Sequence, residues 1–133
     1  MSALSAYLEN KIADHILGRV VFTAPVTVYL ALYTTAPSES GGGTEVSGGS
    51  YARLSVTNSA LNFPDAIAGV KSNGTQLTFI EATAGWGTIT YWGMYDAASG
   101  GNLLFFGALG TPTAIASGDQ LVIPIGDLDI TFE

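Results

Sequence analysis

The chain has 133 residues, a length that suits one domain with one hydrophobic core. Apolar residues make up 47% of the chain and charged residues only 11%, whereas charged residues make up about a quarter of an ordinary soluble domain. The formal net charge is -7 and the four basic side chains are scattered, which argues against binding nucleic acid through its phosphates. A surface so poor in charge is typical of a protein that packs against neighbours.

The sequence contains no cysteine, so disulfides and thiolate metal sites are impossible. No stretch approaches the roughly 18–20 consecutive apolar residues of a membrane-spanning helix. The N-terminus carries Ser2, Glu9, Asn10 and Lys11 where a signal peptide would have an unbroken apolar run. We therefore expect a soluble protein that is synthesised in a cytoplasm and has no membrane partner.

Residues 2–18 are predicted to form an N-terminal helix. Apolar side chains recur every four residues here and form one stripe: Leu4, Leu8, Ile12 and Ile16. Ser2 is the expected N-cap, and Gly18 is expected to take the left-handed position that follows a helix. The stripe is expected to pack on the body of the domain or, alternatively, on a partner chain.

A strand and a glycine-rich segment follow the helix. Residues 26–33 alternate with a period of two, as a pleated strand requires, and Pro25 bars a helix before them. Residues 34–50 contain five glycines and are expected to form a long exposed loop. Connections longer than about 12–15 residues are usually functional or disordered. We expect this loop to be an arm that becomes ordered on a neighbour or, alternatively, a flexible surface loop.

Residues 51–133 predict a β-body of short strands separated by turns. Strands are expected over four ranges outside the central hairpin: 51–57, 76–80, 120–125 and 128–132. Residues 58–73 are expected to be irregular, and Asn73-Gly74 is a strong turn signal. Pro124 suggests that the strand over 120–125 lies at a sheet edge.

An aromatic hairpin over residues 86–109 is the predicted centre of this body. Its first arm places Ile89, Tyr91, Gly93 and Tyr95 on one face and Thr88, Thr90, Trp92 and Met94 on the other. Residues 96–102 include two glycines and an asparagine, which adopt the positive φ of a tight return. Residues 103–106 are apolar on both faces, so we expect this second arm to be covered on both sides.

Seven or eight short strands after one helix predict a mainly β fold. The expected architecture is a single-domain antiparallel β-sandwich or jelly-roll-like body with an N-terminal α-helix. No second helical pattern exists, so a parallel sheet with helical crossovers is excluded as a leading interpretation. No linker or internal repeat divides the chain, and residues 1–133 are therefore predicted to form one domain.

Few residues offer chemistry. His15 is the only histidine and lies at the edge of the helix stripe, and no Gly-x-Ser-x-Gly nucleophile motif is present. Asp127 and Asp129, with Glu133, share a strand face that suits Ca²⁺, but an acidic strand edge that resists wrong pairing is the simpler interpretation. The glycine runs lack the lysine of a phosphate-binding loop. We predict no catalytic residue, no cofactor and no metal site.

The aromatic side chains of the hairpin have two interpretations. Trp86, Tyr91, Trp92 and Tyr95 suit a platform for stacking sugars. Aromatic residues in a strand hairpin more often belong to the core or to a contact between subunits. We favour the second interpretation.

Two stretches resemble a known family. The first is VYLALYTTAP at residues 28–37 with the glycine-rich segment through Arg53, and the second runs from Trp86 to Leu104 and includes GMYDAASGGNLL. Together they resemble the short virion structural proteins of tailed phages and prophages that are labelled tail fibre proteins. Some relatives of that kind are capsid cement or decoration proteins. The resemblance covers nearly the whole chain.

The resemblance implies a non-enzymatic structural protein of the virion, made in the cytoplasm of a bacterial host. The leading hypothesis is a capsid cement or decoration protein that stabilises contacts between capsomers. Its expected partners are the major capsid protein and sister subunits in a homotrimer. The candidate interface residues are Tyr51, Arg53, Trp86, Tyr91, Trp92 and Tyr95.

Two alternatives remain at this point. One is a tail fibre or tail-associated structural protein, although an elongated fibre should show repeats or heptads and the sequence shows neither. The other is a carbohydrate-binding module with Trp86 and Trp92 as its sugar platforms. A structure in which both indoles are buried would exclude this second alternative.

Overall fold

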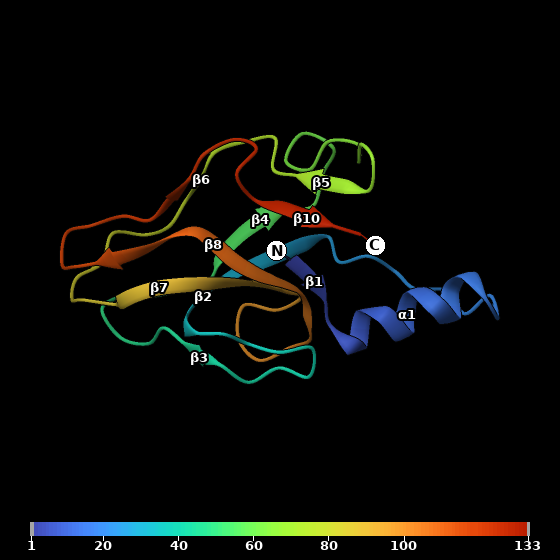
Figure 1. Ribbon diagram of the computed structural model, residues 1–133, viewed down its shortest axis with the longest axis horizontal. Helices are drawn as coiled ribbons and strands as arrows, with labels where there is room; N and C mark the ends of the chain where they lie inside the picture. Colours follow the sequence, from blue (N-terminus) through green and yellow to red (C-terminus); the bar gives the residue numbers. More distant parts are fainter. Residues whose placement is uncertain (1, 133) are drawn as a thin grey trace.

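A six-stranded antiparallel sheet forms the larger layer of the protein (Figure 1), as seen in a computed structural model that describes residues 2–132. The strand order is β1-β8-β7-β2-β3, and β4 also pairs with β2. Strands β3 and β4 occupy successive parts of the same edge of β2. The strand bounds are β1 Ser2–Leu4, β2 Thr27–Thr35, β3 Thr44–Glu45, β4 Leu54–Thr57, β7 Gly87–Tyr95 and β8 Leu103–Ile115.

Two small antiparallel ribbons form the second layer. One pairs β5 (Val70–Ser72) with β10 (Asp129–Thr131), and the other pairs β6 (Leu77–Thr78) with β9 (Val122–Ile123). The mainly β antiparallel fold with an N-terminal helix is therefore confirmed. No helix in residues 2–132 is long and apolar enough to cross a membrane.

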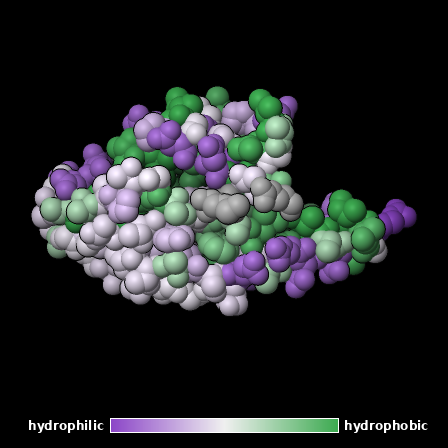
Figure 2. Space-filling model, viewed as in Figure 1, coloured by the Kyte–Doolittle hydropathy of each residue, from purple (hydrophilic) through white to green (hydrophobic). Residues whose placement is uncertain are grey.

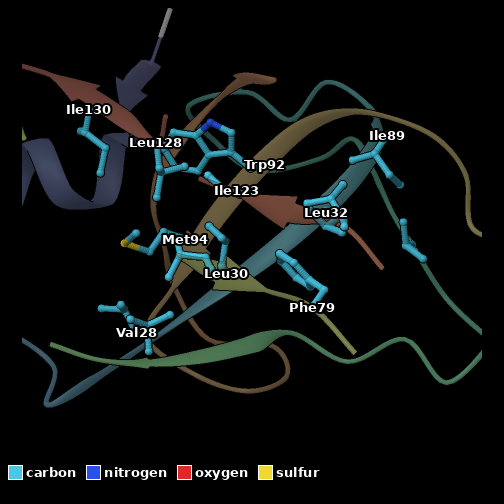
Figure 3. Packing of buried hydrophobic residues seen from close by; sticks show 14 of the residues in the cluster. Val28, Leu30, Leu32, Phe79, Ile89, Trp92, Met94, Ile123, Leu128 and Ile130 are labelled. Atoms are coloured by element: carbon cyan, nitrogen blue, oxygen red, sulfur yellow. The ribbon is translucent and has the colours of Figure 1, made fainter. Parts of the chain in front are cut away.

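The hydrophobic core fills the space between the large sheet and the ribbons. Its members from β2 and β7 point toward side chains from the second layer (Figure 3): Val28, Leu30, Leu32, Ile89, Trp92 and Met94 face Phe79, Ile123, Leu128 and Ile130. Leu32 and Ile89 have no exposed surface. Alternation along β2 explains this arrangement, because every second side chain of a strand points to the same face.

The helix is shorter than the sequence predicts, and its N-cap is a different serine. Helix α1 spans Ala6–Ile16, and Ser2–Leu4 forms strand β1 against β8. The Ser5 side chain caps the helix by accepting from the Leu8 amide at 3.2 Å, and its hydroxyl donates to the Leu103 carbonyl. Ser2 as N-cap was therefore wrong, because edge pairing with β8 extends the first residues. Gly18 does follow the helix with positive φ, as predicted.

The glycine-rich segment 34–50 folds back on its own sheet. Strand β2 continues to Thr35 and pairs there with β3, so part of the segment is paired, while most of its residues are exposed as expected. Ser38 and Gly41 form an additional bridge at its tip, and Val46 is buried in the core. Backbone pairing and one apolar anchor connect the segment to its own sheet, and its ordering on a neighbour or its flexibility stays a prediction.

The predicted alternation along the aromatic hairpin fails at one point. Tyr91 pairs with Ala108, but Ile89 pairs with Thr113, so β8 contains an irregular insertion that includes Pro112. Ile89 and Trp92 both lie in the core although they are three residues apart. Ile89 was wrongly placed on the face of Tyr91, because a bulge shifts the alternation and the sequence of β7 alone does not reveal it. The glycine return is confirmed, with positive φ at Gly100 and Gly101.

Trp92 lies across its cross-strand partner Gly107. The two residues are register partners, and a Cβ atom on Gly107 would approach the indole ring to 3.0 Å. The indole is only 3% exposed, so it has little room to move. Glycine at 107 is therefore required by this close approach and not by its backbone angles.

Replacing Gly107 should destabilise the fold. We expect Gly107→Ala to lower the free energy of unfolding by about 1–3 kcal/mol, because it overpacks the core beside Trp92. Gly110→Ala, in the same strand with no atom near its Cβ position, should change stability by less than about 0.5 kcal/mol. Urea denaturation of both variants tests this, and an equal effect at the two positions would contradict the packing argument.

Candidate functional site

A polar network lies on the face of the large sheet opposite the core, and Arg53 is at its centre. The guanidinium donates through Nε to Glu45 Oε2 and through Nη2 to Glu45 Oε1, both at 2.9 Å. Its Nη1 donates to the carbonyls of Ala97 and Gly100 at 3.0 and 2.9 Å. The guanidinium carbon also lies 3.7 Å from the centre of the Tyr95 ring. Arg53 therefore joins β3, the approach to β4 and the return of the aromatic hairpin.

Three tyrosines complete this Arg53 network. The Tyr51 hydroxyl donates to Glu45 Oε2 at 2.8 Å and accepts from the Leu32 amide at 3.0 Å. The hydroxyls of Tyr33 and Tyr95 share a hydrogen bond. We use "Arg53 network" below for these five residues: Tyr33, Glu45, Tyr51, Arg53 and Tyr95.

Burial and charge set the ionisation of the network. Burial alone would raise the pKa of Glu45, but hydrogen bonds from Arg53 and Tyr51 and the positive charge of Arg53 outweigh it and lower that pKa from its ordinary 4.5. Hydrogen bonds to Glu45 raise the pKa of Arg53 despite its burial. Burial, above all, raises the pKa of Tyr33 and of Tyr51. At neutral pH Glu45 is thus a carboxylate, Arg53 a guanidinium, and Tyr33 and Tyr51 are neutral phenols.

The network binds the chain to itself and leaves no reactive group free. The side chain of Arg53 is 8% exposed and that of Glu45 is 26% exposed, so the ion pair is largely shielded from water. A bidentate arginine–carboxylate pair with an aromatic ring on one side is a strong positioning device. We interpret it as a clamp that holds the hairpin return against β3.

The six predicted interface residues lie in three different environments. Tyr51, Arg53 and Tyr95 belong to the Arg53 network, and Tyr91 is half-buried on β7. Trp86 and Trp92 are buried, at 4% and 3% exposed. The Trp86 indole donates to the Gly49 carbonyl at 3.0 Å and meets the Tyr51 ring edge-on. Their contribution to subunit contacts stays a prediction, and their contacts within the chain are established here.

The sugar-platform alternative is contradicted. A stacking platform needs an exposed aromatic face, and neither tryptophan offers one. Trp92 packs over Gly107 in the core, and Trp86 packs against Tyr51. Sequence periodicity alone did not show that both rings would be covered.

The other candidates for chemistry form no cluster among the described residues. The His15 Nδ1 accepts from the Phe22 amide at 3.3 Å on the exposed side of the helix. Asp129 accepts a hydrogen bond from Ser72 on the neighbouring strand, and Glu133 lies outside the described residues. Within residues 2–132, no three side chains of the metal-ligating types gather in one place.

The most distinctive surface of the protein combines the helix stripe, which was expected to pack on the body or on a partner chain, with residues 17–26, for which no role was predicted. Helix α1 and the extended segment 17–26 project from the body (Figure 1), and we call residues 6–26 the N-terminal arm. The helix stripe is buried at Leu8 but 67% exposed at Ile16. The segment after it exposes Leu17, Val20, Val21 and Val26 at 79%, 57%, 79% and 81%. The sequence does contain a signal for this surface, namely the apolar run at residues 20–22, but no prediction was based on it.

Figure 2 shows this arm as the projecting part of the molecule, with hydrophobic surface along one side and hydrophilic surface along the other. An apolar groove lies where the arm meets the body, with a volume of about 510 Å³. Its walls include Ile12 and Phe22 from the arm and Phe63, Ala66 and Phe105 from the body. Asn58 and Lys71 are the only polar residues among those that line it. A groove of this composition suits apolar side chains and not a charged substrate.

The fold and these surfaces define a small, mainly β protein with a polar clamp on one face of its sheet and an exposed apolar arm. A family model described as podophage GP4 fiber I protein gp80 matches residues 3–131. The chain belongs to this family of phage fibre proteins, which confirms the resemblance to phage virion structural proteins. A comparison with curated proteins finds no significant match.

Removing the guanidinium of Arg53 alone should destabilise the fold more than removing the charges of Arg53 and Glu45 together. We expect Arg53→Met to lower the free energy of unfolding by about 3 kcal/mol, because Glu45 is left half-buried without its partner. Arg53→Lys should lose less, since it keeps the charge but not the bidentate geometry. The double variant Arg53→Met/Glu45→Gln should recover part of the loss. Denaturant titration of the three proteins tests this, and a double variant no more stable than Arg53→Met would contradict it.

Acid should remove the contribution of Glu45. Because the folded pKa lies below the ordinary 4.5, the unfolded chain binds the proton more tightly, so this stabilisation is present above pH 4.5 and is lost as the pH falls through the folded value. The stability difference between the natural protein and Glu45→Gln should therefore shrink in acid. Denaturation curves at neutral and acid pH measure it, and a difference that does not change with pH would refute the assignment.

Proposed function

We propose that the protein is a non-enzymatic structural subunit of the phage virion, built into a tail fibre and attached to its neighbours through the N-terminal arm. The observation that carries this proposal is the exposure of the arm. Six of the large apolar side chains that are exposed in the described chain lie within its residues 12–26: Ile12, Ile16, Leu17, Val20, Val21 and Val26.

The free-energy cost of leaving apolar side chains in water explains why this exposure indicates a contact with another protein. Burying an exposed valine, leucine or isoleucine is favourable by about 1.5–3 kcal/mol. A monomer that leaves several such side chains in water on one projecting element forgoes that stabilisation. Contiguous exposed apolar surface of this kind marks a contact surface for another protein. The body behind it is held together by its own core and clamp, so the arm is available for that contact.

The tail-fibre location is supported by the description of the family, which is that of a fibre protein. A second pocket of about 440 Å³ is lined by Asp127 and Asp129 with no other ionisable side chain, and within residues 2–132 no three metal-ligating side chains gather, which agrees with a structural role. The polar network around Arg53 is satisfied internally and has no free acid, base or nucleophile to offer a substrate.

A capsid cement or decoration role is the second candidate. The observation that favours it is that the chain is short and mainly β, and its sequence shows no fibrous repeat or heptad pattern. In that case the partners would be the major capsid protein and sister subunits, as expected for a homotrimer on the capsid surface. Separating heads from tails of purified virions and measuring the protein in each fraction by mass spectrometry decides between the two locations.

Charges on the arm should keep the protein out of virions without unfolding it. We expect Leu17→Asp/Val21→Asp to fold with an unchanged melting temperature, because both side chains are largely exposed, and to fall about ten-fold or more in virion content. Ile125→Asp, at an isoleucine 65% exposed outside the arm, should be incorporated normally. Quantitative mass spectrometry of virions measures both variants. Normal incorporation of the arm variant would refute attachment through the arm.

A further inference from the structure

We propose that the apolar groove beside the N-terminal arm is a binding site for a free, single-chain fatty acid. The acyl chain lies along the apolar walls, and the carboxylate binds the ammonium group of Lys71. This site goes beyond the proposed function, which concerns assembly with other proteins. The depth of the groove, the composition of its walls and its one cation together select this class of ligand.

The groove reaches into the hydrophobic core. Its volume of about 510 Å³ falls within the range of roughly 300–1,000 Å³ that is usual for small-molecule sites. Four of the residues that line it are at most 4% exposed and belong to the core cluster: Val28, Met94, Leu104 and Ile130. A recess with walls of this kind holds water poorly and takes apolar ligands. An occupant therefore adds its contacts directly to those of the core.

The walls favour a ligand that has no polar groups along its length. Only Asn58 and Lys71 contribute polar side chains to the lining, and the Asn58 Nδ2 already donates to the Pro25 carbonyl at 2.9 Å. A peptide brings an N–H group and a carbonyl with every residue, and apolar walls leave such groups without partners at a high cost. An acyl chain has no such groups, so these walls suit it better than a peptide.

Lys71 determines the charge of the ligand. It lies opposite Ile130 in the register of β5 with β10, so both side chains share one face of this ribbon, and both line the groove. Lys71 forms no salt bridge within residues 2–132. Asp129 lies opposite Ser72, on the other face, and accepts a hydrogen bond from it. The described residues that line the groove include no acid. The groove thus offers one cation to an anionic group.

A fatty acid satisfies the walls and the cation at the same time. An uncharged hydrocarbon would leave the ammonium group of Lys71 without a partner, and a ligand charged along its length would meet apolar walls. The acyl chain of a membrane lipid is already surrounded by hydrocarbon, so it gains little by entering the groove. A free fatty acid in water gains the full burial of its chain. This difference favours the free acid as the ligand.

A bound chain would also connect the arm to the body. Ile12 and Phe22 of the arm form walls of the groove together with Phe63 and Phe105 of the body. A ligand between these side chains contacts both parts and stabilises their relative position. Because it binds the folded protein and not the unfolded chain, it should raise the melting temperature.

Calorimetric titration of the full chain with laurate, kept below its micelle concentration, tests the site. We expect one molecule to bind per chain and laurate to raise the melting temperature. Each methylene removed should weaken binding about four-fold, so decanoate should bind about fifteen-fold more weakly than laurate. Absence of saturable laurate binding, or equal affinities for the two acids, would overturn the proposal.

The role of the cation is tested with a second ligand and two variants. The natural protein should bind laurate at least about ten-fold more tightly than dodecylammonium, which has a chain of the same length and the opposite charge. Lys71→Glu should reverse this preference. Lys11→Glu makes the same change on the exposed side of the helix, outside the lining of the groove, and should leave the preference unchanged. Circular dichroism melting without ligand checks that both variants fold.

Three results would contradict the assignment to a free fatty acid. Equal affinities of the natural protein for laurate and dodecylammonium would exclude Lys71 as the partner of the head group, and this comparison needs no variant. An unchanged preference in a folded Lys71→Glu protein would do the same. Co-sedimentation with phosphatidylglycerol vesicles, without binding of free laurate, would show that the groove takes a membrane lipid instead.

Discussion

The pairing of β2 with β7 is the contact on which the rest of the structure depends. The two strands run antiparallel at the centre of the large sheet, from Tyr29 opposite Tyr95 to Tyr33 opposite Tyr91. One face of this pair holds Leu30, Leu32, Trp92 and Met94 and is covered by the two ribbons (Figure 3). The opposite face holds Tyr33 and Tyr95 and carries the Arg53 network. A change in register of one residue would exchange the two faces, so the core and the clamp constrain each other.

This division explains why the body needs so few charges. The apolar layer supplies most of the stabilisation, and a single shielded ion pair fixes the hairpin return and β3 on the other side. Every buried polar side-chain atom in the described residues has a hydrogen-bond partner. The body is thus complete as a folded unit. The N-terminal arm is covered at Leu8, but the body leaves Ile16, Leu17, Val20, Val21 and Val26 exposed.

Local patterns in the sequence predicted the elements whose causes are local. The four-residue stripe gave the helix, and the glycines of residues 96–102 gave the return with positive φ at Gly100 and Gly101. The failures have long-range causes. The bulge that brings Ile89 into the core depends on the partner strand β8, and the pairing of Arg53 with Glu45 depends on β3 folding back on β2. Ser2 lost the N-cap position because β1 pairs with residues a hundred positions away.

The candidate surface was predicted least well, and the reason is physical. Aromatic residues attracted the functional hypotheses, but large rings gain the most from burial and were taken into the core and the clamp. The exposed surface of the arm is aliphatic, and Val20 and Val21 follow the helix without continuing its periodic pattern. Only the three-dimensional arrangement shows that the helix runs past the edge of the body (Figure 1) and leaves these side chains without cover.

The most direct test of the account is a density map of the intact virion at side-chain resolution. The account predicts that Leu17 and Val21 are buried against another protein chain in the assembled particle. Arms that stand free in solvent in the assembled particle would contradict it.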